Sequence, residues 1–97
     1  MDQEVKLVVL IDVQAGKAEQ QIRLFNNLKP LVLEEEGCFE YELHRVTDNE
    51  DQLVLTERWS SEAAWKAHHE TPHMKEASKL TPSFRAGPTK VLRLDLV

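Results

Sequence analysis

The chain has 97 residues, a length that suits a single small domain spanning residues 1–97. Its net charge is −5, and no basic block appears, which argues against binding to a nucleic-acid backbone. No apolar stretch approaches the roughly 18 residues of a membrane span, and the acidic N-terminus lacks the charge pattern of a signal peptide. The single cysteine, Cys38, excludes an internal disulfide. We therefore expect a soluble cytoplasmic protein.

The first part of the chain reads as a strand followed by a helix. Residues 4–13 carry apolar side chains on both faces, which is typical of a central strand covered on each side. Residues 17–36 have helical spacing, and Pro30 within them should kink or interrupt the helix. Three glutamates at 34–36 oppose the helix dipole, so this end should fray or be held by tertiary contacts. Gly37 then suits a C-terminal cap.

The middle of the chain predicts a hairpin. Residues 38–46 alternate between apolar and polar side chains, as a half-buried strand does. Residues 47–51 have turn chemistry, and 52–59 form the returning strand.

The second helical region is predicted as two segments, at about 61–70 and 72–82. Ser60 is the expected N-cap of the first segment. Thr71 followed by Pro72 suits a fresh N-cap with proline at the first helical position.

The chain ends with a predicted strand at 89–97, after a turn at Gly87-Pro88. Alternation along this strand places three leucines toward the core: Leu92, Leu94 and Leu96.

The element order β-α-β-β-α-β predicts a ferredoxin-like α+β sandwich, because crossovers are right-handed and connections are short. The helices would cover one face of the sheet and leave the other face open. Since 41% of the residues are hydrophobic, we expect two open faces to stack in a homodimer, a barrel-like α/β assembly.

Two stretches resemble a known family, the antibiotic biosynthesis monooxygenase domain. They are "EEEGCFEYELHR" and "LTERWSSEAAWKAHHETPH". The similarity is greatest to small quinol-monooxygenase-like members and to a related isomerase of a phosphorylated signalling ligand. The matching positions are Gly37-Cys38, Tyr41, Glu57, Trp59, Ala64 through His68, and Thr71-Pro72-His73.

The resemblance implies a dimer of ferredoxin-like protomers with a pocket between helices and sheet. Monooxygenase members oxidise phenols or quinols with O2 and without metal or flavin, because the substrate anion supplies the electrons. Haem-degrading relatives place Trp and His ten residues apart on the second helix. Here the matching positions are His68 and Ser78, while Trp59 and His69 have the interval but Trp59 ends a strand. The pattern therefore disfavours haem degradation.

His68, His73 and Tyr41 are the candidate catalytic residues. The motif places His68 on the pocket side of its helix, where an imidazole that titrates near neutrality suits a general base; a polar residue that merely closes the pocket is the alternative. His73 follows a helix start and would assist, or lie at a dimer contact. The hydroxyl of Tyr41 would bond a phenolate or carbonyl, although core packing explains it equally well.

Three aromatic side chains are candidates for binding substrate: Phe25, Trp65 and Trp59. At helical spacing, such residues are more often plain core. His69 should point about 100° away from its neighbour, toward solvent. His44 falls on the opposite sheet face.

No metal or other cofactor is predicted. His69 and His73 have the i, i+4 spacing of a helical zinc pair, but Pro72 interrupts the helix between them and no third ligand is evident. Glu57 and Arg58 suit a structural ion pair, and Cys38 suits a buried, inert thiol.

The function that we expect is cofactor-independent oxidation of a small quinol or phenol by O2. An isomerase of a small hydroxyketone or its phosphate would use the same histidines as proton carriers. A dimeric metabolite-binding protein without catalysis is the third reading.

Overall fold

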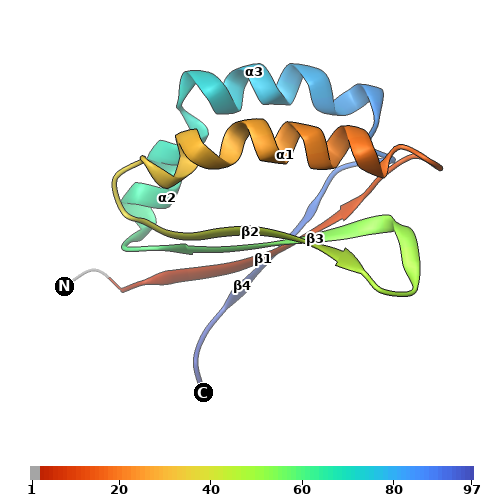
Figure 1. Ribbon diagram of the computed structural model, residues 1–97. Coiled ribbons are helices and arrows are strands. Elements are labelled where there is room, and N and C mark those ends of the chain that lie inside the picture. The colour runs from red at the N-terminus through yellow and green to blue at the C-terminus, as the bar shows by residue number, and fades with distance from the viewer. Residues whose placement is uncertain (1–2) are drawn as a thin grey trace.

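A computed structural model describes residues 3–97. Four strands form one antiparallel sheet in the order β2-β3-β1-β4, and α1 and α3 run side by side over one of its faces (Figure 1). This is the ferredoxin-like α+β fold. The elements are β1 (Val5–Asp12), α1 (Ala18–Leu33), β2 (Cys38–Val46), β3 (Asn49–Trp59), α2 (Glu62–His69), α3 (Pro72–Leu80), a 3-10 turn (Thr81–Ser83) and β4 (Lys90–Leu94).

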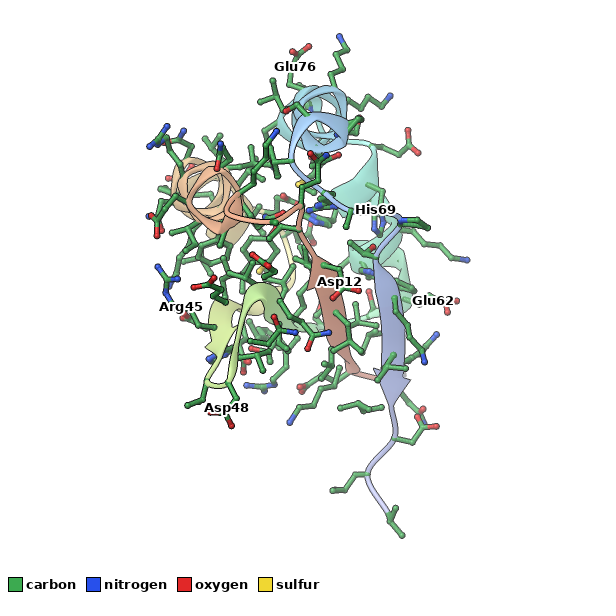
Figure 2. The ribbon with its side chains drawn as sticks, turned by 90° about the vertical axis from the view of Figure 1, so that its right-hand side faces the viewer. Asp12, Arg45, Asp48, Glu62, His69 and Glu76 are labelled. Atoms are coloured by element: carbon green, nitrogen blue, oxygen red, sulfur yellow. The ribbon has the colours of Figure 1, made fainter. Side chains whose placement is uncertain are left out.

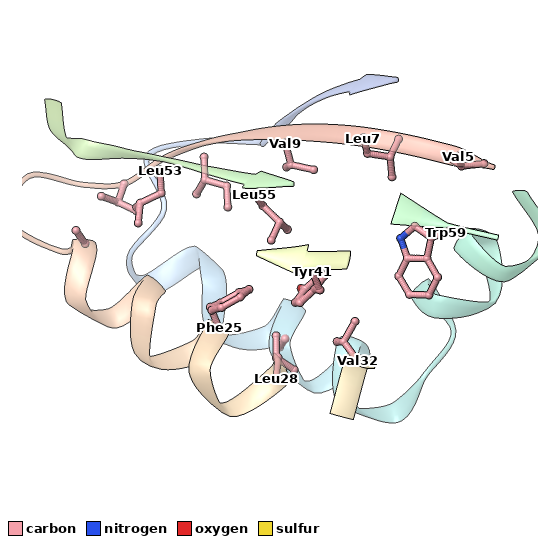
Figure 3. Packing of buried hydrophobic residues seen from close by; sticks show 14 residues of the cluster. Val5, Leu7, Val9, Phe25, Leu28, Val32, Tyr41, Leu53, Leu55 and Trp59 are labelled. Atoms are coloured by element: carbon pink, nitrogen blue, oxygen red, sulfur yellow. The ribbon is translucent and has the colours of Figure 1, made fainter. Parts of the chain in front are cut away.

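β1 is a central strand, as its two apolar faces predicted. It pairs with β3 on one side and β4 on the other. Leu7, Val9 and Ile11 point toward the helices and are at most 7% exposed, within the buried cluster drawn in Figure 3. Val8 and Leu10 lie on the opposite face and are partly exposed.

Helix α1 continues through Pro30 as one element, so the predicted interruption is wrong. Pro30 lacks an N–H, and its ring crowds the carbonyl of Asn26 one turn earlier. Both residues are exposed, so water can solvate that carbonyl and the helix tolerates the loss. The helix ends at Leu33, and the acidic residues 34–36 form the turn that follows.

Helix α2 begins one residue later than predicted, because Ser61 and not Ser60 is its N-cap. The Ser61 hydroxyl accepts a hydrogen bond from the Ala64 amide at 3.1 Å. The Ser60 amide instead donates to the Gly37 carbonyl at 2.8 Å and ties α2 to the start of β2. Thr71 caps α3 as predicted.

The predicted orientation of the last strand is wrong. Leu92 pairs with Val8 and Leu94 with Lys6, on the face away from the helices. Val91 pairs with Val9 on the helix side, where it lines a cavity. Leu96 lies beyond the strand and is fully exposed. The leucine-rich side was assigned to the core on its apolarity, whereas it forms part of the open sheet face.

No helix among residues 3–97 has the length and apolar character required to cross a membrane.

Candidate active site

A cavity of about 220 Å³ lies between the helices and the sheet. α1 packs over β2 and β3, and α3 packs beside α1, so the side of the sheet near β1 and β4 is less closely covered (Figure 1). Side chains from all four strands and all three α-helices line the space that remains. An apolar cavity of about 150 Å³ can hold benzene, so this one has room for a single substituted ring.

Phe25 and Trp65 are part of the cavity wall, as the sequence predicted for substrate-contacting aromatics. The Phe25 ring stacks on Tyr41 with centroids 5.3 Å apart, and Figure 3 shows the two rings facing each other between α1 and β2. Aromatic faces of this kind suit a flat, apolar ring as ligand.

His68 lines the cavity from α2 and is only 3% exposed. Its Nδ1 lies 2.9 and 3.0 Å from the two carboxylate oxygens of Glu35, which follows the end of α1. Its ring packs on Trp59, with centroids 4.7 Å apart. The carboxylate therefore fixes the tautomer with the proton on Nδ1 and leaves Nε2 as an acceptor.

Glu35 also binds His73, whose Nε2 lies 2.6 Å from Oε2. One carboxylate thus holds two imidazoles from α2 and α3. The donor atoms of Glu35, His68 and His73 all lie within 4.8 Å of one another, so they are also a candidate ligand set for a metal ion. Tetrahedral zinc at about 2.0–2.1 Å keeps its ligand atoms about 3.3 Å apart. The 2.6 Å separation is a hydrogen-bond distance, and metal binding would require the groups to move apart.

His68, Tyr41 and Glu57 each leave one polar atom available to a ligand. Among residues 3–97, no buried side-chain nitrogen or oxygen lacks a hydrogen-bond partner. Yet His68 Nε2, the Tyr41 hydroxyl and Glu57 Oε2 make no side-chain hydrogen bond there, although all three residues are buried. These atoms must therefore have accessible surface, and all three residues line the cavity. A ligand in the cavity can meet a base, a hydroxyl and a carboxyl group.

The protonation states follow from burial. Burial lowers the pKa of His68, against the opposing pull of Glu35, so the imidazole is neutral at pH 7. Burial raises the pKa of Glu57, although the Trp59 N–H at 3.0 Å from Oε1 opposes the rise. Burial and the Glu57 carboxylate raise the pKa of Tyr41, so its hydroxyl stays protonated and can donate. His68 is therefore a neutral imidazole whose Nε2 can accept a proton from a ligand in the cavity.

Comparisons with known proteins give the family. The model of the antibiotic biosynthesis monooxygenase family matches residues 5–80. The chain belongs to this family.

Among curated relatives of this monooxygenase-family protein, YcnE of Bacillus subtilis (strain 168), named a monooxygenase, is 29% identical over 92 residues, 95% of this chain and 97% of that protein. YgiN of Escherichia coli (strain K12), named a quinol monooxygenase, is 32% identical over 83 residues, 75% of this chain and 80% of that protein. Both names give the activity provisionally. The crystal structure of PA3566 from Pseudomonas aeruginosa superposes with a TM-score of 0.90 at 25% identity, covering 100% of this chain and 97% of that one. Family and relatives together support a monooxygenase.

Two candidates of the sequence analysis lie outside the wall of this family member's cavity. Trp59 is fully buried and packs behind His68, where its N–H holds Glu57. His73 contacts Glu35, which is not part of the cavity wall either, and Glu35 in turn contacts the cavity residue His68. His69 is exposed, as expected, yet it also lines the cavity rim and contacts Trp65 edge-on; Figure 2 places it between the helices and β4.

Three other expectations concern residues near the site. The Arg58 side chain pairs with Glu4 rather than Glu57, because Arg58 and Glu57 point to opposite sheet faces. His44 lies on the open face, 3.4 Å from the Thr56 hydroxyl. The thiol of Cys38 is half-buried, and burial together with nearby carboxylates raises its pKa to about 11, so it is protonated and unreactive.

The sequence analysis missed Glu35 and Arg85. Glu35 carried one signal, an acidic run at a helix C-terminus that only a tertiary contact could favour. Arg85 also lines the cavity, where it contacts Gln21. Nothing in the sequence around Arg85 indicated this position.

Proposed function

We propose that the protein is a cofactor-independent monooxygenase that oxidises a single-ring quinol or phenol with O2, acting as a homodimer. One observation supports this most strongly. His68 is neutral and held by Glu35 through Nδ1, and its Nε2 is available in a cavity with aromatic walls. This is the arrangement that deprotonating a bound phenol requires.

The reaction begins when His68 Nε2 accepts the proton of a ring hydroxyl. Glu35 stabilises the resulting imidazolium, as a carboxylate does behind a catalytic histidine. The electron-rich phenolate then reduces O2. A ring carbon forms a new C–O bond, the O–O bond breaks, and the second oxygen atom leaves as water.

The electrons and atoms of this reaction balance without another reductant. A benzene-1,4-diol and O2 give a hydroxybenzoquinone and water, and the substrate supplies all four electrons that O2 accepts. The two hydroxyl protons and the displaced ring proton end in water and in the new hydroxyl group. The Tyr41 hydroxyl can donate a hydrogen bond to an oxygen whose charge changes.

One observation favours a second candidate. His68 and Glu57 are two groups in the same cavity that can carry a proton, which suits proton transfer between adjacent carbons of a hydroxyketone, an isomerisation. Oxygen uptake separates the two reactions, since an isomerase consumes no O2.

The test is an oxygen-electrode assay of the protein after a chelator has removed metal ions. The substrates are substituted benzene-1,4-diols and monophenols. We expect one O2 consumed for each hydroxyquinone formed. A hydroxyketone converted at constant O2, with no uptake on any diol or phenol, would establish the isomerase instead.

A further inference from the structure

Arg85 contacts Gln21 near the start of α1, whereas His68 contacts Glu35 just beyond the end of that helix. The Arg85 amide donates to the Thr81 carbonyl at 2.9 Å, and its backbone bridges to Val13. Its side-chain Nε donates to the Gln21 amide oxygen at 2.9 Å. Gln21 is 4% exposed, and both residues line the cavity. The guanidinium is therefore oriented before any ligand arrives.

Arg85 has no carboxylate partner among residues 3–97. Three of the other four arginines there each bind a glutamate: Arg45, Arg58 and Arg93. Arg23, which also forms no ion pair there, is exposed. Arg85 is partly buried, and burial lowers its pKa, which reflects the cost of desolvating the cation. Gln21 accepts from only one of the five guanidinium N–H groups. A buried cation with donors to spare is what an anionic ligand would complete.

Tyr41, Glu57 and Arg85 all line the cavity. The Glu57 carboxylate raises the pKa of the Tyr41 hydroxyl, and the Arg85 guanidinium lowers it, so both fields reach that hydroxyl. An anion in the cavity is repelled by Glu57 and attracted by Arg85. A substrate with one negative substituent would therefore bind in one orientation, with its ring hydroxyl toward His68.

We propose that Arg85 and Gln21 form a carboxylate subsite, so that the preferred substrate is a hydroxylated aromatic carboxylate. Arg85 is the only lysine or arginine among the described residues that line the cavity, which matches a monoanion rather than a phosphate dianion. A guanidinium binds a carboxylate with two parallel hydrogen bonds, a geometry that lysine cannot reproduce. A volume of about 220 Å³ has room for one ring bearing a carboxylate. This inference rests on the proposed function for the identity of the ring.

Anaerobic calorimetric titration tests the subsite without turnover. The probes are 2,5-dihydroxybenzoate and its neutral match, 2,5-dihydroxybenzamide. We expect the acid to bind the wild-type protein at least about tenfold more tightly than the amide. Arg85→Gln should reduce that preference to within about twofold and leave amide binding nearly unchanged. Arg85→Lys should keep part of the preference, since it keeps the charge but loses the planar fork.

Arg23→Gln is the matched control, because Arg23 is an exposed cation on the same helix as Gln21. It should leave both affinities unchanged. Circular dichroism and melting establish that each variant folds, and Arg85→Lys keeps the test decisive should Arg85→Gln unfold. Equal affinities for acid and amide, undetectable binding of both, or equal effects of the Arg85 and Arg23 substitutions would overturn the subsite.

Oxygen uptake, measured separately, distinguishes this proposal from the proposed function. Arg85-dependent binding of the acid with no O2 consumption would keep the subsite and refute the oxygenase. Equal O2 consumption with acid and amide, unchanged in Arg85→Gln, would keep the oxygenase and refute the subsite.

Discussion

The Glu35 carboxylate gives the two ring nitrogens of His68 different roles. Glu35 takes the proton-bearing Nδ1, and because the imidazole is neutral this contact is a hydrogen bond rather than an ion pair before catalysis. When Nε2 accepts a proton, the same contact becomes charge-assisted and strengthens. The interaction is therefore stronger in the transition state than in the resting protein, which is what accelerates a reaction.

His68→Ala should lower activity far more than His69→Ala. A positioned base commonly contributes about 10²–10⁴-fold in rate. His69 is exposed at the cavity rim, so its loss should change kcat/KM only a few-fold. Because His68 is 3% exposed and packs on Trp59, His68→Gln is the companion variant: it fills more of the space and can still contact Glu35, but it cannot act as a base.

Melting temperatures must first show that these variants fold. Small and equal losses of kcat/KM from both substitutions would mean that the histidines do not participate in the reaction. A larger loss at His69 would assign the base to the rim of the cavity.

Glu35→Gln should move the acid limb of the pH profile to lower pH while reducing the plateau. Burial already sets the His68 pKa below 6.5, and Glu35 opposes that shift. Activity of the wild type should therefore fall as pH drops through a value below 6.5, where His68 becomes protonated. Removing the Glu35 charge lowers that pKa further. The plateau of kcat/KM should fall by about tenfold or more, because the remaining imidazole is less basic.

The measurement is kcat/KM against pH for both proteins, with Glu36→Gln as the control because Glu36 is an exposed neighbour. A limb that moved to higher pH in Glu35→Gln would show that Glu35 does not stabilise the His68 cation. An unchanged profile would remove His68 as the titrating base.

The sequence identified residues whose role is local, and it missed those defined by distant contacts. His68, Tyr41, Phe25 and Trp65 follow from helical or strand spacing together with the family motif, and all four line the cavity. Their catalytic and binding roles stay predictions. Glu35 meets His68 across 33 positions, and Arg85 meets Gln21 across 64. Pairings over such separations depend on how the helices pack on the sheet, which spacing along the chain does not encode.

At the level of the elements, Gly37 connects the turn that carries Glu35 to the helix that carries His68. Its φ of +83° lies in the left-handed region, and a Cβ there would come within 2.8 Å of the Ala64 Cβ and would also meet the Ser60 hydroxyl. Only glycine allows this close approach. The carboxylate and the imidazole depend on it for their contact.

Gly37→Ala should destabilise the protein more than Gly16→Ala. Gly16 has a similar φ of +77°, but its Cβ would meet nothing within 4 Å. Gly16→Ala therefore isolates the conformational cost, about 1 kcal/mol. Gly37→Ala adds the steric conflict, for a total of about 3 kcal/mol. Urea unfolding at one protein concentration measures the free energy of unfolding of both variants. Equal losses would mean that α2 can move away from the new Cβ without destabilising the protein.

Gly37→Ala should also reduce activity in the fraction that remains folded, because it separates Glu35 from His68, while Gly16→Ala should not. This second readout separates a loss of fold from a loss of alignment.

Element boundaries were predictable where the alternation of side chains had one meaning. β2 matches its predicted span, Cys38–Val46. β4 does not behave as predicted, because both of its faces contain apolar residues and one face belongs to the cavity wall. Periodicity shows that two faces differ, but it does not show which of them the helices cover.

For the molecule as a whole, a single chain leaves one face of the sheet uncovered. Apolar side chains from three neighbouring strands lie on it, and none of the helices within residues 3–97 covers it (Figure 1). They are Val8, Leu10, Val54, Leu92 and Leu94. Exposed apolar surface of this continuity is typical of an interface between copies of one chain. The inverted orientation of β4 places two more leucines there than the sequence predicted.

We predict a homodimer built on this face, and Leu92→Glu should dissociate it. A carboxylate in the middle of an apolar interface loses its hydration without gaining a partner, a cost of several kcal/mol that is incurred twice across a twofold axis.

Leu80→Glu is the matched control. Leu80 is 54% exposed and Leu92 38%, but Leu80 lies on α3, on the helical side. If exposure alone determined association, Leu80→Glu would have the larger effect. Sedimentation velocity at low micromolar concentration should show a dimer for the wild type and for Leu80→Glu, and a monomer for Leu92→Glu. A monomeric wild type, or a dimer that persists in Leu92→Glu and dissociates in Leu80→Glu, would place the contact elsewhere or remove it.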